Sequence, residues 1–310
     1  MPDNPRPWLA IVNPASGPAR GRSSWPDIAR ALRDAGVSFT VEQTRRPREG
    51  EELARRAVLA GHRRLLVAGG DGSVHDVVNG IMTADPSVHE GTMLAVAPLG
   101  TGNDWARSLG MHLPPRELAA AISAAHTVRH DVGAIDFPDR APPRRRWFIN
   151  VAGAGFDAHV IARLPVHVPS TLAYLRGALV GLATYRSPRF TIRAGDLTID
   201  QRLLLAFVAN AQACGNGMQV APTARTDDGL LDLVAIDAIG LLHALPKIAK
   251  LYRGTILGDP VVRHARAERV RLDAKPAADI EADGQIVGRT PAEFSVVARA
   301  LSVVVPPRPS

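Results

Sequence analysis

In the first 130 residues, short apolar runs alternate with segments in which apolar residues recur every three or four positions. An apolar run without a polar face predicts a strand that is buried on both sides, and the second spacing predicts an amphipathic helix. Such alternation predicts a doubly wound, mainly parallel α/β sheet. The expected strands are residues 9–12, 37–43, 65–68 and 93–97, and the expected helices are residues 23–35, 51–59, 74–81, 103–109 and 116–125.

From about residue 132 onward, strand-like runs recur without long helices between them, which predicts an antiparallel β domain, a sandwich or half-barrel. The expected strands are residues 147–151, 190–193, 203–208, 231–236, 261–263 and 270–272, with two more runs in 294–305. Two helices are expected among them. The helix over 241–252 is amphipathic, and the apolar helix over 170–185 is interpreted as wedged between two domains, where it could also line a binding cleft or touch a membrane. Segment 138–146, rich in proline and arginine, is expected to be an exposed, solvated hairpin connection.

Three of the expected strands end in turns that contain glycine, serine or threonine, and asparagine. They are Asn13-Pro14-Ala15-Ser16-Gly17, Gly69-Gly70-Asp71-Gly72-Ser73 and Pro98-Leu99-Gly100-Thr101-Gly102-Asn103-Asp104. Ligands of open parallel sheets bind beyond the carboxyl ends of the strands, so these turns are expected to converge on one ligand. Glycine lets a phosphate approach the backbone, and a helix that begins in such a turn points N–H groups at an anion. A single Gly-Gly-x-Gly would suit an ordinary tight turn equally well, and the other two turns favour phosphate binding.

A length of 310 residues suggests two domains. The net charge is +7 and comes almost entirely from arginine, which favours contact with an anionic membrane surface unless it merely reflects codon usage. Aromatic residues make up 5%, too few to suggest base stacking, so no nucleic acid partner is expected. The single cysteine, Cys214, suits a reducing compartment, and no signal peptide or membrane-spanning segment is recognisable. We therefore expect a cytoplasmic protein that binds peripherally to membranes.

In their order and spacing, the three turns resemble the diacylglycerol kinase catalytic-domain family, above all its bacterial soluble lipid kinases, which are related to the sphingosine and ceramide kinases. The likeness continues in residues 148–157, 221–231 and 283–284, and so covers nearly the whole chain. It implies an α/β nucleotide-binding domain over 1–130, completed by 295–310. A β-rich domain for lipid substrate and metal over 131–294 would follow, with a cleft between the two.

The resemblance implies that the chain transfers the γ-phosphate of ATP, with Mg²⁺, to the hydroxyl of a lipid alcohol such as diacylglycerol. One alternative is a soluble acceptor, because NAD kinases share the Gly-Gly-Asp-Gly signal. Another is a catalytically weak protein that only binds lipid or nucleotide. A dinucleotide-binding oxidoreductase is disfavoured, since no Gly-x-Gly-x-x-Gly follows the first strand.

The residues expected to bind ATP lie in the three turns, at the start of the helix after the second turn, and at Thr44, where the family has a threonine that contacts the nucleotide. They are Asn13, Ser16, Gly17, Thr44, Gly69, Gly70, Asp71, Gly72, Ser73, Val74, His75, Thr101, Gly102 and Asn103. Asp71 is the carboxylate nearest the phosphates, so it would hold the metal through water or act as the base on the acceptor side; a structural role as an acceptor of N–H bonds stays open. His75 would either hydrogen-bond the loop or lie on the helix surface.

The resemblance also places a divalent cation away from the nucleotide, bound by the Asp228 carboxylate and the backbone carbonyls of Arg225 and Leu230. Such oxygen ligands suit Mg²⁺ or Ca²⁺, and a plain Asp-Gly turn is the alternative interpretation.

The family usually has Asp-Gly-Glu where this chain has Asp283-Gly284-Gln285. Because Gln285 cannot accept a proton, the role of base cannot transfer to it. Either Asp283 or Asp71 deprotonates the acceptor while Gln285 hydrogen-bonds it, or the chain binds without catalysis. We favour the first interpretation, with low activity, since the nucleotide motifs are otherwise intact.

Overall fold

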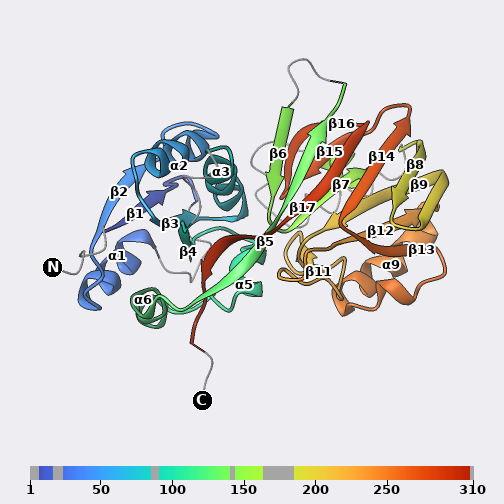
Figure 1. Cartoon of the computed structure of the whole chain (residues 1–310). Helices are drawn as coiled ribbons and strands as arrows, with labels where there is room; N and C mark the ends of the chain where they lie inside the picture. The colour runs from blue at the N-terminus through green and yellow to red at the C-terminus, as the bar shows by residue number, and fades with distance from the viewer. Residues whose placement is uncertain (1–6, 17–23, 85–90, 140–143, 163–184, 308–310) are drawn as a thin grey trace. The chain divides into compact units, whose positions relative to one another are not determined.

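The computed structural model describes residues 7–16, 24–84, 91–139, 144–162 and 185–307 (Figure 1). The chain divides into two compact units, one formed by Met1–Val132 with Ala298–Ser310 and the other by Gly133–Val297. The chain passes from one unit to the other within two long strands, β5 (Thr127–Phe137) and β17 (Ala292–Val304). The two units are therefore described one after the other.

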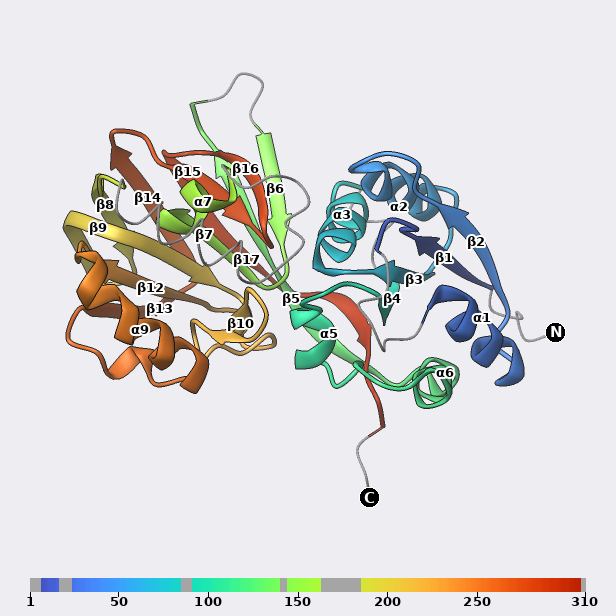
Figure 2. The ribbon, with the colours of Figure 1, turned by 180° about the vertical axis from the view of Figure 1, so that it is seen from behind.

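The first unit is built on a parallel sheet in the order β2-β1-β3-β4, to which the last residues of β17 add a parallel strand through Ser302 and Val303. Every residue of β1 is buried, as are all but the first residues of β3 and β4, because helices cover both faces of the sheet. Figures 1 and 2 show α2 and α3 on one face and α1 and α6 on the other. The strands are β1 (Trp8–Val12), β2 (Phe39–Gln43), β3 (Arg64–Gly69) and β4 (Met93–Pro98), and the helices are α1 (Trp25–Asp34), α2 (Glu49–Leu59), α3 (Asp71–Met82), α5 (Asp104–Ser108) and α6 (Pro115–Ala124).

In the second unit all the registered strand pairs are antiparallel, along a path β16-β15-β7-β9-β8-β14-β17, with β12 joining β9 to β13 and β5 pairing with β6. Its strands are β6 (Arg144–Phe148), β7 (Val151–Gly155), β8 (Arg189–Ala194), β9 (Leu197–Ala209), β10 (Ala213–Cys214), β11 (Met218–Gln219), β12 (Leu231–Asp237), β13 (Val262–Ala267), β14 (Arg269–Lys275), β15 (Asp279–Ala282) and β16 (Gln285–Arg289). Its helices are α7 (Phe156–Ile161), α9 (Leu241–Arg253) and the 3₁₀ turn Ile256–Gly258.

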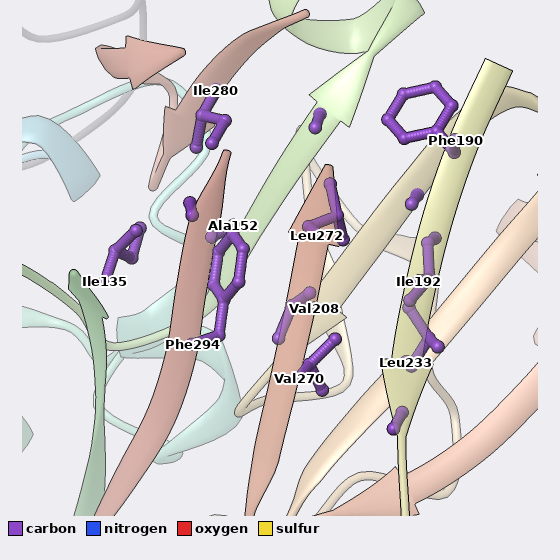
Figure 3. Close-up of a cluster of buried hydrophobic side chains, with 14 of the residues drawn as sticks. Ile135, Ala152, Phe190, Ile192, Val208, Leu233, Val270, Leu272, Ile280 and Phe294 are labelled. Atoms are coloured by element: carbon purple, nitrogen blue, oxygen red, sulfur yellow. The ribbon is translucent and has the colours of Figure 1, made fainter. Parts of the chain in front are cut away.

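Strand β9 explains why this unit has two apolar cores. From Leu205 to Ala209 its side chains alternate, so that Ala206 and Val208 join the cluster drawn in Figure 3, whereas Leu205 and Phe207 join a second cluster on the other face. The continuous apolar run 203–209 is therefore a strand buried on both faces. The predicted fold class, a parallel α/β domain followed by an antiparallel β domain, is confirmed.

Several details differ from the sequence-based expectation. The expected strand over 147–151 is interrupted, since β6 ends at Phe148 and β7 begins at Val151. The two runs expected in 294–305 are one strand, β17. The expected hairpin connection over 138–146 lies partly, at 140–143, outside the described residues; β5 and β6 pair antiparallel on either side of it, β6 begins at Arg144, and Arg146 is buried rather than solvated. The expected helix over 170–185 falls, up to residue 184, outside the described residues. Among the described residues, no helix has the length and hydropathy needed to span a bilayer.

Candidate functional site

The carboxyl ends of β1, β3 and β4 lie at one edge of the parallel sheet, and the three predicted turns contact one another there. The Asn13 backbone N–H donates to the Ala68 carbonyl at 2.9 Å, and its side-chain Nδ2 donates to Ser73 Oγ at 3.1 Å. The Leu99 N–H donates to the Gly69 carbonyl at 2.9 Å, so the third turn is joined to the second. The three predicted turns thus lie together at one sheet edge of the first unit, as expected.

The second and third turns touch through backbone atoms at Gly70 and Gly100. A Cβ at Gly70 would lie 3.0 Å from Gly100 Cα, and a Cβ at Gly100 would lie 2.5 Å from Gly70 Cα. Asn103 fixes the third turn by accepting from the Gly100 N–H at 3.0 Å and donating to the Gly100 carbonyl at 2.8 Å. Asn103 itself adopts a left-handed backbone, φ +53°, and is buried. Two glycines are needed here because one turn packs on the other without room for side chains.

Helix α3 begins directly at the second turn, with Gly70 as its N-cap and no side chain capping it. The positive end of a twelve-residue helix therefore points out of this turn, the usual arrangement for binding an anion. Ser73 does not cap the helix, because its hydroxyl accepts from Asn13. Asp71 Oδ1 accepts the Trp105 backbone N–H at 3.2 Å, so Asp71 has the structural role that the sequence left open, while its side chain remains only half-buried.

The other expected nucleotide residues differ in accessibility. Thr44 follows β2 and donates its N–H to the Val12 carbonyl at 2.9 Å, at the same sheet edge. Ser16, Gly72 and Gly102 are half-buried, and Thr101 is exposed. Val74 and His75 are buried, so a position of His75 on the helix surface is wrong; its Nε2 lies 3.3 Å from the Asn79 amide instead. The remaining expected residue, Gly17, lies outside the described residues.

In the second unit, Asp283 binds backbone groups through both of its carboxylate oxygens. Oδ1 accepts the Asn150 N–H at 2.9 Å and Oδ2 accepts the Ile149 N–H at 3.0 Å. The backbone of Asp283 is left-handed, φ +49°, and its own N–H donates to the Val151 carbonyl at 2.9 Å. Asp283 therefore stabilises the two residues, Ile149 and Asn150, at which the chain leaves β6 before it enters β7. Gln285 begins β16 opposite Ala282 and is half-buried.

Two carboxyl groups near this turn carry no role in the sequence-based expectation. Glu281, on β15, is buried and accepts the Gly284 N–H at 2.8 Å. Asp157 lies in the first turn of α7, and within the described part of the chain no donor meets its two buried carboxylate oxygens in good hydrogen-bond geometry. The backbone N–H groups of Asp157 and Ala158 lie near enough to oppose the effect of burial on its pKa. Burial raises the pKa of Asp157 to about 7, and burial with the nearby Asp157 charge raises the pKa of Glu281 well above its usual range. Two such groups retain a proton at neutral pH, because both cannot ionise cheaply.

Tyr185 belongs to the same neighbourhood. Its hydroxyl is buried and has no hydrogen-bond partner among the residues that the structure describes, and its ring packs edge-on against His159 at 4.9 Å between centroids. Burial and the charge of Asp157 raise the pKa of Tyr185. The sequence does not single out this cluster, because Glu281, between Ile280 and Ala282, resembles a surface residue, and only the packing shows that Asp157 lies near it.

The expected metal ligands form a turn that is closed by ion pairs. Asp228 Oδ1 accepts the Leu230 N–H at 3.1 Å, and its other oxygen contacts the guanidinium of Arg266. Arg225 pairs with Asp227 at 3.1 Å. The residues described contain no group of three or more acidic, histidine or cysteine side chains that could hold a metal ion. Asp228 is thus oriented as in an Asp-Gly turn, with Arg266 as its cation.

Comparisons with known proteins agree with this arrangement. Family models match over residues 7–135, for the diacylglycerol kinase catalytic domain, and over residues 150–305, for the YegS C-terminal NAD kinase beta sandwich-like domain. A diacylglycerol kinase of Bacillus subtilis is 27% identical over 300 residues, which cover 96% of this chain and 95% of that protein. A Pseudomonas fluorescens protein named "Probable lipid kinase YegS-like" is 30% identical over 283 residues, covering 89% and 88%. The crystal structure of a diacylglycerol kinase from Bacillus anthracis matches with a TM-score of 0.71 at 18% identity, covering 97% of both chains.

The raised pKa of the buried Asp157 leads to a prediction about stability. A carboxyl group with a raised pKa keeps a proton in the folded chain that the unfolded chain releases, so wild type should lose stability as the pH rises from about 4 to about 7. Asp157→Asn should remove most of this loss and be more stable than wild type at pH 8, by on the order of 2–4 kcal/mol. Urea unfolding at pH 5 and pH 8 measures this. The exposed Asp196→Asn is the control; equal pH dependence in wild type and Asp157→Asn would contradict the prediction.

Proposed function

The chain belongs to the family of proteins with a diacylglycerol kinase catalytic domain, and from this premise we propose that it transfers the γ-phosphate of ATP to the hydroxyl of a lipid alcohol such as diacylglycerol. Relatives named as diacylglycerol kinases and YegS-like lipid kinases support a kinase that acts on lipids. The observation that carries the ATP part is the backbone contact of Gly70 with Gly100 beside the uncapped start of α3.

The phosphates would bind at the backbone of the second turn, where the helix end attracts negative charge. Ser16, Thr44 and Thr101 are accessible enough to contact the rest of the nucleotide. The buried Asn103, by contrast, uses both atoms of its side-chain amide to hydrogen-bond Gly100, and the side chain of His75, in α3, is buried. Both residues would therefore position the turns without touching the nucleotide through their side chains.

Asp71 is the carboxylate that would hold Mg²⁺ at this turn, because it is half-buried and lies at the start of α3. A bound Mg²⁺ would neutralise charge on the phosphate oxygens. The bond from the Trp105 N–H to one Asp71 oxygen would keep the carboxylate beside the bound phosphates.

On the acceptor side, Asp283 is a weak candidate for the base, since both of its oxygens already accept backbone N–H groups. A proton on Asp283 would break one of these bonds. Of the two aspartates, we therefore propose Asp71 rather than Asp283 as the group that orients the acceptor hydroxyl. A loose transition state needs little help from a base, so this arrangement supports low activity.

A divalent cation at Asp228 would have to replace Arg266. The ligands are hard oxygens, as Mg²⁺ and Ca²⁺ prefer, but the structure has a guanidinium on one of the carboxylate oxygens. We propose that the two cations exchange at this turn.

The kinase proposal is tested by supplying ATP–Mg²⁺ with a panel of lipid alcohols in detergent micelles, and NAD in a parallel reaction, and weighing the products by mass spectrometry. Gly70→Val should weaken ATP binding about 100-fold, because its Cβ meets Gly100 and displaces the start of α3. Gly258→Val is the matched control, since nothing lies within 4 Å of a Cβ there. If NAD alone is phosphorylated, the acceptor is a soluble molecule and not a lipid. If Gly70→Val binds ATP as well as wild type does, the nucleotide does not bind at this turn.

The acceptor side is tested by restoring the glutamate of the family. Gln285→Glu should raise kcat on the lipid, up to the 10²–10⁴-fold that a general base typically contributes. Asp283→Asn should lower stability by about 1–3 kcal/mol, because its NH₂ group cannot accept from a backbone N–H. Rates and urea unfolding separate the two effects, with the exposed Gln212→Glu as control. A rate that stays at the wild-type value in Gln285→Glu would remove this turn from the acceptor side.

The cation proposal predicts that Mg²⁺ or Ca²⁺ raises the melting temperature of wild type, by the mass action of binding to the folded state alone. Asp228→Ala should abolish this rise, whereas Asp227→Ala, which removes only the neighbouring carboxylate paired with Arg225, should keep it. A melting temperature that does not respond to either ion would leave Asp228 as a turn residue held by Arg266.

A further inference from the structure

The sheet formed by β9, β8, β14 and β17 buries one face and exposes a basic one. Figure 3 shows Phe190, Ile192, Val270 and Leu272 in the buried cluster on the first face. Strand side chains alternate, so the residues between them point to the other face. On that exposed face lie Arg189 and Arg193 of β8, Arg202 of β9, and Arg269, Arg271 and Lys275 of β14. We call these six residues the basic face.

The register of the strands sets like charges directly opposite one another on the basic face. Arg193 faces Arg271, and Arg189 faces Lys275 on one side and Arg202 on the other. Residues that face each other across a sheet have Cβ atoms about 4.5–5.5 Å apart, a spacing at which like charges destabilise the sheet. Three such pairs in adjacent strands are an arrangement that folding alone disfavours.

Carboxylates on the same face compensate only part of this charge. Asp200 pairs with Arg189 at 2.8 Å. Glu293 of β17 faces Arg271 in the strand register, and its carboxylate lies 3.5 Å from the guanidinium of Arg269. The third carboxylate, Asp273, accepts the Ala274 N–H at 2.7 Å. Arg193, Arg271 and Lys275 have no ion-pair partner within the part of the chain that the structure describes.

We propose that the basic face docks the protein on a bilayer rich in anionic phospholipid. The face belongs to a sheet, so it presents its cations side by side to a broad surface, and anionic headgroups would relieve the repulsion within it. Each cation near such a surface contributes additively to binding. No aromatic side chain stands on the exposed positions of β8 and β14, which disfavours stacking with nucleic acid bases. The inference rests on the proposed function, because it supposes an acceptor that resides in a membrane.

The test compares wild type with the variant Arg193→Gln/Arg271→Gln/Lys275→Gln in sedimentation with vesicles, without ATP. Vesicles of phosphatidylcholine with phosphatidylglycerol should bind wild type at low salt, and vesicles of phosphatidylcholine alone should not. The variant should bind about 100-fold more weakly, from three lost cations. It should also melt at a higher temperature than wild type, since the opposed charges are gone. A variant damaged by misfolding would melt lower.

The control variant Arg30→Gln/Arg55→Gln/Arg116→Gln removes the same charge from exposed positions of α1, α2 and α6. It should bind the anionic vesicles like wild type. Equal loss in both variants would overturn the proposal, because net charge and not the basic face would then attract the membrane. If the Arg193→Gln/Arg271→Gln/Lys275→Gln variant (the Arg193 variant) loses binding to DNA but keeps binding to the vesicles, the proposal is overturned and the basic face binds nucleic acid.

Activity separates this inference from the proposed function. The Arg193 variant should phosphorylate a long-chain diacylglycerol in anionic vesicles more slowly than wild type, and a short-chain diacylglycerol in solution at the same rate. If neither protein phosphorylates any lipid, yet only wild type binds the vesicles, the docking surface stands and the proposed function fails. If both act equally on vesicle and soluble substrate, the docking surface fails and the kinase stands.

Discussion

The contact between the Gly70 and Gly100 backbones is the constraint on which the site of the first unit depends. Strands β3 and β4 stay in register up to Gly69 and Pro98, so the two turns leave the sheet side by side. They can do so only while neither position carries a Cβ. With the turns in contact, Asp71 accepts the Trp105 N–H in the first turn of α5, and Ser73 in the first turn of α3 accepts from the Asn13 side chain. The glycines thus determine where the start of α3 lies, and they would also leave room for a phosphate to approach the backbone.

The second unit shows a comparable dependence on a carboxylate. Ile149 and Asn150 leave the strand ladder between β6 and β7, and their N–H groups would be unsatisfied in a buried position without Asp283. The Asn150 carbonyl in turn accepts from Asn210 and Ala211, which ties the same point to the end of β9. Asp283, one of the two aspartates considered as a base, is therefore a structural support, and we expect its substitution to change stability first.

The sequence predicts this fold best where burial is continuous. Residues 65–68 and 203–208 are apolar on both faces, and a run of that kind has few other interpretations. Strands β15 and β16 escaped prediction because Glu281, buried in β15, looks like a surface residue, and α7 was missed because it is one short turn after Gly155. In the site, the glycines could be predicted from backbone chemistry. The buried state of His75 and Asn103 could not, because a polar residue does not show in the sequence whether its hydrogen bonds are made to the protein or to a ligand.

Gln285 has a second consequence that only the packing of the second unit makes visible. Glu281 is bonded to Gly284, the residue before Gln285, and the charges of Asp157 and Asp283 both raise its pKa. A glutamate at position 285 would add a further carboxylate next to a turn where Glu281 already keeps its proton because its pKa is raised. The amide avoids that repulsion, so the loss of a base at this position is offset by a less strained set of buried charges. Asp157 is likewise kept at a cost in folding energy, because burial desolvates its carboxylate and raises its pKa to about 7.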